Sequence, residues 1–258
     1  MLQETRLHRI RALLAALHQL STERIMKELG VSRETARRDI IALDAQGAGR
    51  RVHGGLVSLD AMPEPPLTVR SASMPGEKRA IARAATELVQ PGQTLFMDAG
   101  STTTMLAEAL RTMSGLTIIT NSLNAALKLS LAEEHETLNN EIILLGGSMR
   151  AGAQETRGEL TVSEIYRYRA DVALLSPVGV EASQGASSFY PYEAAIAGAM
   201  TQQSGRLILL ADSSKVGLCS RINYASVDKI TTLISDRAAA ALPAMAALQQ
   251  VLPQVILV

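Results

Sequence analysis

The stretch Val31-Ser32-Arg33-Glu34-Thr35-Ala36-Arg37-Arg38-Asp39-Ile40 decides the fold of the N-terminal part of this chain. Ser32 can cap a helix that starts at the next residue, because its hydroxyl can accept a hydrogen bond from the first turn. Ala36, Ile40 and Leu43 recur at helical spacing and form one apolar stripe. The sequence therefore predicts an arginine-rich helix that packs through one narrow face and exposes its polar residues.

A second short helix precedes this one across a tight turn. Ser21 or Thr22 can cap a helix that runs through Leu29, and Gly30 supplies the turn. An apolar pattern over residues 7–17 predicts a further helix before both. Two helices across such a turn form a helix-turn-helix, in which the second helix enters the major groove of DNA with its N-terminal residues forward. An ordinary helical hairpin whose arginines only face water remains the alternative.

A glycine-rich basic segment follows, and Arg50 to Val57 is predicted to form a small hairpin, or wing, against the DNA backbone or minor groove. Arginine can contact guanine or phosphate, and serine or threonine hydroxyls can contact either. The residues expected to contact DNA are Thr22, Ser32, Arg33, Glu34, Thr35, Arg37, Arg38, Arg50, Arg51 and His53.

The charge is distributed unevenly along the 258 residues. Residues 1–57 hold 10 Lys/Arg against 6 Asp/Glu, whereas residues 58–258 hold 15 against 19. A basic piece joined to an acidic one suits a nucleic-acid-binding module with a separate second domain, although chance asymmetry would look the same. The proline-rich stretch at 62–66 stops any helix and marks a linker. We therefore expect a winged helix-turn-helix domain over 1–57, a linker over 58–76 and an α/β domain over 77–258.

Composition excludes several classes of protein. A single cysteine, Cys219, rules out an intramolecular disulfide framework. No apolar run is long enough to span a bilayer and no signal peptide is evident at the start, so we expect a cytoplasmic protein with no membrane partner. The four histidines show no ligand spacing with one another or with Cys219. Neither a metal site nor a cofactor is expected.

The second part alternates between short apolar strands and amphipathic helices, which predicts a largely parallel, Rossmann-like sheet covered on both faces. The expected helices cover residues 77–89, 102–110 and 123–131. The expected strands are Thr94–Met97, Leu116–Ile119, Ile142–Leu145, Val172–Leu175, Leu207–Leu210, Ile230–Ile234 and Val255–Val258.

Polar or glycine-rich clusters follow four of these strands, at 97–104, 120–122, 146–150 and 211–215. In open α/β sheets, ligands bind outside the carboxyl ends of the strands. A Gly-Ser-Thr loop that runs into a helix offers N–H groups, hydroxyls and a positive dipole end to an anion such as phosphate. Taken singly, each cluster could be only a helix cap, a turn or a solvated surface, but four together favour a ligand site.

These motifs resemble the DeoR family of bacterial regulators. The stretch 31–40 is similar to its V-S-x-x-T-x-R-R-D-l signature, and residues 51–55 resemble its R-x-H-G-G wing. The four strand-end clusters match its D-x-G-(S/T)-T, T-N-(S/N)-L, G-G-x-x-R and D-x-S-K motifs. Ala36 stands where the family usually has Ile, and Ala48-Gly49 stands where it has a Leu in the turn.

The resemblance implies a sensor domain like ribose-5-phosphate isomerase and CoA-transferase, which responds to phosphorylated sugars, sugar alcohols or related catabolites. It also implies a repressor that acts on double-stranded operator DNA. We expect a dimer or tetramer, because paired modules can read symmetric half-sites about one helical turn apart or multiples of it. The phosphate would be held by Gly100, Ser101, Thr102 and Thr103. The rest of the effector site would be lined by Asp98, Asn121, Gly147, Arg150, Glu193 and Lys215.

One segment departs from the family pattern. Residues 185–193 lack its threonine-rich turn, and Phe189, Tyr190 and Tyr192 bring three of the seven aromatic residues together before Glu193. This segment could shape an effector pocket, form a subunit contact or simply pack a loop.

A sugar-phosphate isomerase or transferase with an accessory DNA-binding module is the alternative function, because Asp98, Glu193 and Lys215 include an acid, a base and a cation. The basic helix and wing argue against it, since an isomerase has no use for them. A pure protein-interaction module leaves the strand-end clusters unexplained. We therefore expect a regulator, not an enzyme.

Overall fold

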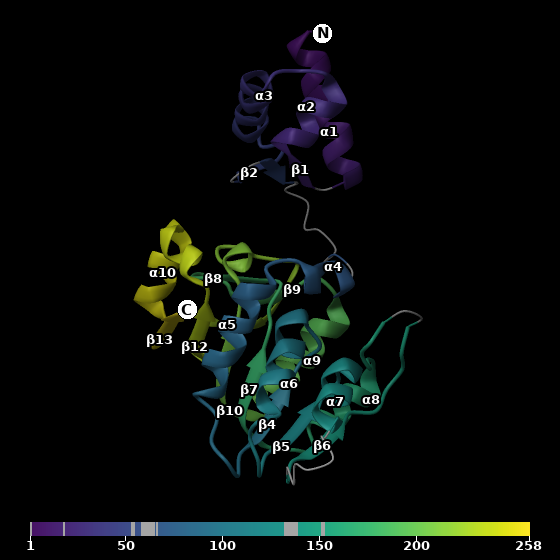
Figure 1. The fold of residues 1–258 in the computed structure, drawn as a ribbon, viewed down its shortest axis with the longest axis vertical. Helices are drawn as coiled ribbons and strands as arrows, with labels where there is room; N and C mark the ends of the chain where they lie inside the picture. The colour runs from purple at the N-terminus through teal and green to yellow at the C-terminus, as the bar shows by residue number, and fades with distance from the viewer. Residues whose placement is uncertain are drawn as a thin grey trace. The chain divides into compact units, whose positions relative to one another are not determined.

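The computed structural model describes residues 2–17, 19–52, 55–57, 65, 67–131, 139–150 and 153–258. The chain divides into two compact units, Met1–Pro63 and Glu64–Val258 (Figure 1). The domain boundaries at residues 57 and 76 stay a prediction, because most of the proline-rich stretch lies outside the described residues. No described helix is both long and apolar enough to cross a membrane.

The first unit is a winged helix-turn-helix with α1 (Gln3–Leu17), α2 (Thr22–Leu29) and α3 (Arg33–Ala45). The wing is an antiparallel sheet in the order β1-β3-β2, formed by β1 (Gln19–Ser21), β2 (Arg50–Val52) and β3 (Gly55–Val57). The predicted hairpin is therefore confirmed. Its third strand, β1, was missed, because three residues between two helices carry no strand pattern.

The predicted helix caps are confirmed. The hydroxyl of Ser21 accepts a hydrogen bond from the N–H of Arg24 at 3.1 Å, and the hydroxyl of Ser32 accepts one from the N–H of Thr35 at 3.3 Å. Gly30 ends α2 in the left-handed region, with φ of 63°, which glycine adopts without steric cost. These local signals determine where α2 begins and ends and where α3 begins.

The second unit is built on a sheet of seven parallel strands in the order β13-β12-β10-β7-β4-β5-β6. The strands are β4 (Thr94–Met97), β5 (Thr117–Thr120), β6 (Glu141–Leu144), β7 (Ala170–Leu175), β10 (Ser204–Leu210), β12 (Ile230–Ser235) and β13 (Gln254–Leu257). All seven strands expected from the sequence are present, within a few residues of their predicted ends, and the parallel sheet is confirmed.

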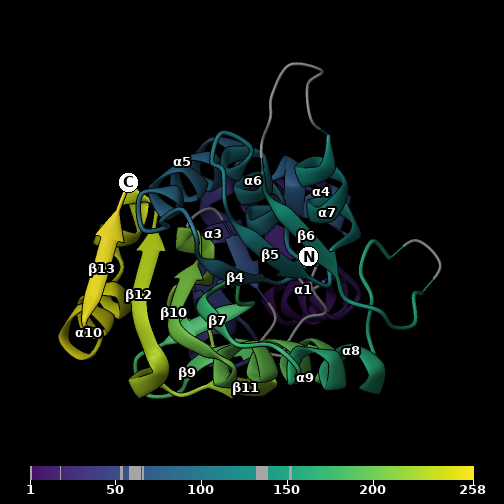
Figure 2. The same cartoon turned by 90° about the horizontal axis from the view of Figure 1, so that it is seen from below.

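Helices cover both faces of this sheet, as Figure 2 shows. One face carries α5 (Pro75–Thr86), α6 (Ser101–Leu110) and α7 (Leu123–Ser130), with an apolar core between them and the strands. The other carries α8 (Glu159–Ile165) and α9 (Pro191–Gln202), and its core extends to α10 (Pro243–Val251). The short helix α4 (Leu67–Ala72) precedes α5 inside the predicted linker.

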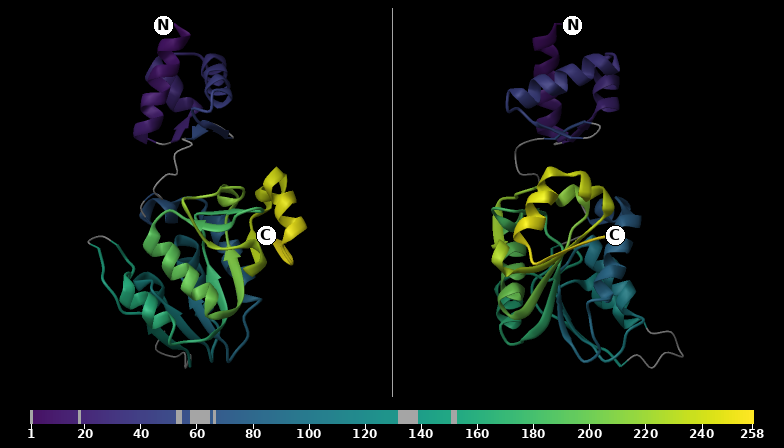
Figure 3. Two further views of the ribbon diagram at one scale, coloured as in Figure 1. Left: turned by 180° about the vertical axis from the view of Figure 1, so that it is seen from behind. Right: turned by 90° about the vertical axis from the view of Figure 1, so that its left-hand side faces the viewer.

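A second, three-stranded antiparallel sheet lies on the α9 side and was not predicted (Figures 2 and 3). It consists of β8 (Gly179–Glu181), β9 (Gly185–Ser188) and β11 (Ile222–Ala225). Strand β9 reads Gly-Ala-Ser-Ser and is fully buried, so it lacks the apolar alternation that marks a half-exposed strand.

The strand order places a switch point in the middle of the large sheet. From β4 the chain adds β5 and β6 on one side, then returns with β7 to the other side of β4 and continues outward through β10, β12 and β13. Ligands of open α/β sheets bind in the crevice at such a point, outside the carboxyl ends of the strands. A ligand site is therefore expected at the carboxyl ends of β4 and β7.

Candidate functional site

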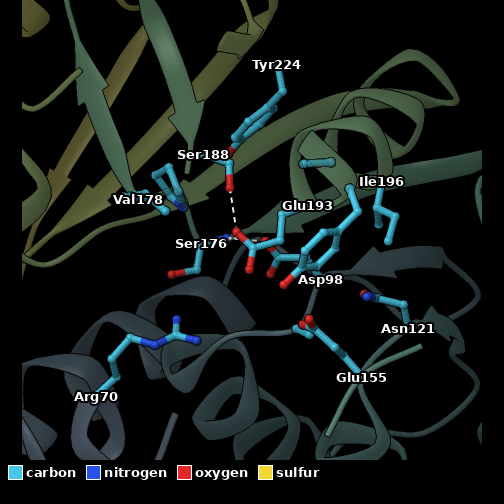
Figure 4. Close-up of a pocket in the computed structure, with 14 residues that line it drawn as sticks. Arg70, Asp98, Asn121, Glu155, Ser176, Val178, Ser188, Glu193, Ile196 and Tyr224 are labelled. Atoms are coloured by element: carbon cyan, nitrogen blue, oxygen red, sulfur yellow. Dashed lines mark hydrogen bonds between the residues drawn. The ribbon is translucent and has the colours of Figure 1, made fainter. Parts of the chain in front are cut away.

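A pocket lies at the carboxyl ends of β4 and β7. Asp98 follows β4 and Ser176 follows β7, and the N–H of Ser176 donates a hydrogen bond to Oδ2 of Asp98 at 3.0 Å. The pocket has about 460 Å³ of empty space, part of it open to solvent. It is lined by Arg70, Asp98, Ala99, Asn121, Glu155, Ser176, Pro177, Val178, Ser188, Tyr192, Glu193, Ile196, Ala197 and Tyr224 (Figure 4).

The small sheet and α9 supply one wall of the pocket. Glu193 lies in the first turn of α9, where a carboxylate is favoured by the helix dipole, and it accepts a hydrogen bond from the hydroxyl of Ser188 on β9 at 2.7 Å. Tyr224 reaches the pocket from β11. Segments that lie far from Asp98 in the sequence thus converge on it in the fold.

The buried Oδ1 of Asn121 and the buried hydroxyl of Tyr224, both in the lining, have no hydrogen-bond partner among the described residues. The amide of Asn121 is held in place, because its Nδ2 donates to the carbonyl of Thr156 at 3.1 Å. Burial raises the pKa of Tyr224 well above its ordinary value, and the charge of Asp98 raises it further. Leaving such groups unsatisfied costs stability, so a ligand that pairs with them gains affinity.

Three of the residues predicted for the effector site, Asp98, Asn121 and Glu193, line this pocket. The predicted phosphate loop lies beside them, where Gly100 precedes α6 and Ser101 to Thr103 form its buried first turn. No side chain caps that turn, and the hydroxyls of Thr103 and Thr104 donate back to the carbonyl of Gly100. The first N–H groups of a helix have no partner within it, so this end of α6 suits an anion.

The other three predicted residues are not among those that line the pocket. Arg150 is exposed, and Lys215 is half-buried in the 3₁₀ turn after β10. Gly147 has a local reason to be glycine: its φ is 148°, and a Cβ there would lie 2.1 Å from Oγ1 of Thr161. Their contact with an effector stays a prediction.

Sequence reasoning missed Arg70, Glu155, Tyr192 and Tyr224. Arg70 fell inside the predicted linker, and Glu155 reaches the pocket because its segment bridges to Ser122 after β5. Only the aromatic run pointed to Tyr192. Its ring stacks on Tyr190 and lies 4.8 Å from the guanidinium of Arg157. Burial, followed by the charges of Glu193 and Glu155, raises the pKa of Tyr192 to about 12. At least part of the aromatic segment therefore shapes the pocket.

In the first unit, the predicted DNA-contacting residues of α3 lie on its exposed side. Ser32, Arg33, Glu34, Arg37 and Arg38 are exposed, while Thr22 and Thr35 are half-buried. Ion pairs link Arg33 to Glu23 at 2.6 Å and Arg38 to Glu34 at 3.3 Å. Arg51 is exposed; His53 and the side chain of Arg50 lie outside the described residues. The exposed arginines of α3 can therefore contact a DNA groove while the apolar face of the helix stays packed in the core.

A buried ion pair, which no sequence pattern predicted, fastens α3 to α1. Asp39 is fully buried, and Nε and Nη2 of Arg6 donate to its two carboxylate oxygens at 2.6 and 3.0 Å. Such a fork is stronger than a single neutral hydrogen bond, because it combines charge with two parallel hydrogen bonds. The hydrogen bond to Asp39 raises the pKa of Arg6. The pair fixes which side of α3 faces outward.

Comparison with known proteins links both units to one family. Residues 6–62 match the model of the DeoR-like helix-turn-helix domain, and residues 73–237 match that of the DeoR C-terminal sensor domain. The chain is 32% identical over 217 residues to the glycerol-3-phosphate regulon repressor of Escherichia coli (strain K12), covering 84% of each chain. It is 34% identical over 242 residues to the HTH-type transcriptional repressor GlcR of Bacillus subtilis (strain 168), covering 92% of this chain and 90% of that protein.

Among solved structures, the chain is similar to ribose 5-phosphate isomerase A from Methanocaldococcus jannaschii. The match covers 54% of this chain and 52% of that one, at 17% identity and a TM-score of 0.37. This likeness is too slight to support an argument, so the fold rests on the strand order described above.

Proposed function

This chain belongs to the DeoR family of transcriptional regulators, and from that premise we propose that it is a repressor released from its operator by a phosphorylated sugar or polyol. The observation that carries the proposal is the coexistence of an exposed, arginine-rich α3 in one unit and a polar pocket at the switch point of the other. Relatives named as repressors, one of them of a glycerol-3-phosphate regulon, support regulation over the isomerase alternative.

For the first unit, we propose that α3 enters the major groove and that the wing contacts the backbone. Arg33, Arg37 and Arg38 are exposed on α3, and breaking the surface ion pairs of Arg33 and Arg38 to bind phosphate or guanine costs little. We expect two copies of the chain to read symmetric half-sites about one helical turn of DNA, or a multiple of it, apart.

For the second unit, we propose that the effector phosphate binds the uncapped N-terminus of α6, at Gly100 to Thr103. The hydroxyl-bearing part would then extend toward Asp98, Asn121 and Glu193. Carboxylate and amide oxygens accept hydrogen bonds from hydroxyl groups, and Oδ1 of Asn121 is a buried acceptor without a protein partner among the described residues. Release from DNA follows if the effector binds more tightly to the conformation that has lower affinity for the operator.

A thermal-shift screen tests the sensing half. The panel is glycerol 3-phosphate, fructose 6-phosphate and ribose 5-phosphate, each beside its unphosphorylated counterpart. A ligand at a hundred times its Kd stabilises the folded state by about 2.7 kcal/mol, which is about 5–10 °C for a unit of this size. We expect such a shift with at least one phosphorylated compound. Turnover of a sugar phosphate would instead favour the enzyme alternative.

Gly100→Ala is expected to weaken effector binding at least tenfold while DNA affinity stays within twofold. The new Cβ would lie 3.1 Å from Oγ1 of Thr103 and 3.3 Å from Cβ of Ser176, so it crowds the carboxyl ends of β4 and β7. Gly76→Ala is the matched control, because a Cβ there has no atom within 4 Å. Titration by thermal shift checks both variants, and effector affinity that Gly100→Ala leaves unchanged would place the effector elsewhere.

A further inference from the structure

Arg70 lines the pocket and also contacts the segment that joins the two units. It lies on α4 and lines the pocket, where Figure 4 shows its guanidinium directed toward the other lining side chains. Its Nε also donates a hydrogen bond to the carbonyl of Pro65 at 3.0 Å. Pro65 is part of the Pro63-Glu64-Pro65-Pro66 stretch that covalently joins the units. One side chain therefore touches both the ligand space and the linker backbone.

The lining of the pocket carries more negative than positive charge, which makes Arg70 important for the binding of an anion. Among the described residues that line it, Arg70 is the only cationic side chain, against the three carboxylates of Asp98, Glu155 and Glu193. An anionic ligand in this space meets three negative charges and one positive charge. Arginine binds phosphate through two N–H groups in a fixed fork, which a point charge cannot imitate. The cationic group that an anion can bind among the described lining residues is therefore that of Arg70, in addition to the N-terminal N–H groups of α6.

The backbone of α4 at Arg70 is held in place by hydrogen bonds from Lys78. A movement of the Arg70 side chain therefore does not require the helix to shift. Lys78, only 4% exposed, donates through Nζ to the carbonyl of Arg70 at 2.6 Å and to that of Ser73 at 2.8 Å. The same ammonium lies 3.7 Å from the carboxylate of Asp212 after β10. The end of α4 is thereby tied to the large sheet.

We propose that Arg70 binds the anionic group of the effector and transmits its arrival to the linker. A phosphate that takes the side-on fork of the guanidinium, Nε with one Nη, displaces the carbonyl of Pro65. Binding in the pocket and release of the carbonyl of Pro65 then become one event. This inference rests on the proposed function, because it requires an anionic effector at this site.

The test uses the full chain and three variants: Arg70→Ala, Arg70→Lys and, as a control for loss of one positive charge, Arg79→Ala on the exposed side of α5. The probes are inorganic phosphate and glycerol 3-phosphate, with glycerol as the uncharged comparison. Thermal shift measures affinity, and hydrogen exchange of the amides of Glu64 and Leu67, which flank Pro65 and Pro66, measures the state of the linker. Melting without ligand establishes that each variant is folded.

We expect Arg70→Ala to lose at least tenfold in affinity for the phosphate probes, Arg70→Lys to lose less, and Arg79→Ala to behave as the native chain. Bound phosphate should speed exchange at the amides of Glu64 and Leu67 in the native chain, because it displaces the carbonyl of Pro65 from Arg70. Arg70→Ala should show this faster exchange without ligand and no further response to it, because the bond to Pro65 is already absent.

Equal phosphate affinity in Arg70→Ala and Arg79→Ala would overturn the inference, as would exchange in the native chain that bound phosphate leaves unchanged. A native chain stabilised by glycerol or another uncharged compound, but by neither phosphate probe, would overturn the inference and leave a sensing function in place. A chain stabilised by nothing in the wider panel would overturn the proposed function itself.

Discussion

Asp39→Ala is expected to unfold the helix-turn-helix unit at 37 °C and to abolish DNA binding, while the second unit still melts as in the native chain. Removing the fully buried Asp39 abolishes both hydrogen bonds that join α3 to Arg6 on α1, and hydrogen bonds to charged groups contribute about 1.5–3 kcal/mol each. A unit of about 60 residues has little more than that in total stability. Two-transition calorimetry of the full chain, with circular dichroism, measures the loss.

Glu34→Ala is the matched control for this prediction. It removes the partner of Arg38 in an ion pair whose side chains are about 70% exposed, and exposed pairs contribute at most about 1 kcal/mol. The two variants remove the same charge from the same helix, so they separate burial from charge. If Asp39→Ala melts like Glu34→Ala, the fork between α1 and α3 does not hold α3 in place.

The double variant Arg37→Ala, Arg38→Ala is expected to lower operator affinity by about 100-fold or more while the melting of the first unit changes little. Both side chains are exposed on α3, so their removal affects DNA binding rather than the core. Each phosphate that the variant no longer neutralises also reduces the slope of log K against log salt by about 1. Fluorescence anisotropy at several salt concentrations, on an operator selected from random duplexes, gives both quantities.

Arg79→Ala, Arg83→Ala on α5 is the control, because it removes two exposed positive charges from the second unit. It should leave both the affinity and the salt slope near the native values. Equal losses in the two double variants would mean that net charge, and not α3, carries the DNA binding.

Local chemistry made much of this fold predictable from the sequence. The caps at Ser21 and Ser32 and the turn at Gly30 act through neighbouring backbone atoms, so residue type and spacing are enough to place them. The seven strands of the large sheet are short, apolar runs between polar turns, which is the pattern of strands buried on both faces. The small sheet escaped prediction because its buried strand β9 is made of glycine, alanine and serine.

The candidate pocket was only partly predictable, because it depends on strand order. Asp98 and Asn121 follow strands directly and could be identified as strand-end residues, and the resemblance supplied Glu193. That β7 returns beside β4, and so brings Ser176 to Asp98, is a property of the assembled sheet. Arg70 and Tyr224 come from α4 and β11, two elements without a clear sequence pattern. Tertiary packing decides that the side chains of Arg70 and Tyr224 reach the same pocket.

Operator affinity of the full chain, measured with and without a phosphorylated effector, decides whether the protein is a ligand-released repressor. DNA selected from random duplexes is titrated by anisotropy, first alone and then with the compound that gives the largest thermal shift. We expect tight, salt-sensitive binding that falls at least tenfold with the phosphorylated compound and not with its unphosphorylated counterpart. If the chain binds no DNA sequence, or if the bound effector leaves operator affinity unchanged, the protein is not a ligand-released repressor.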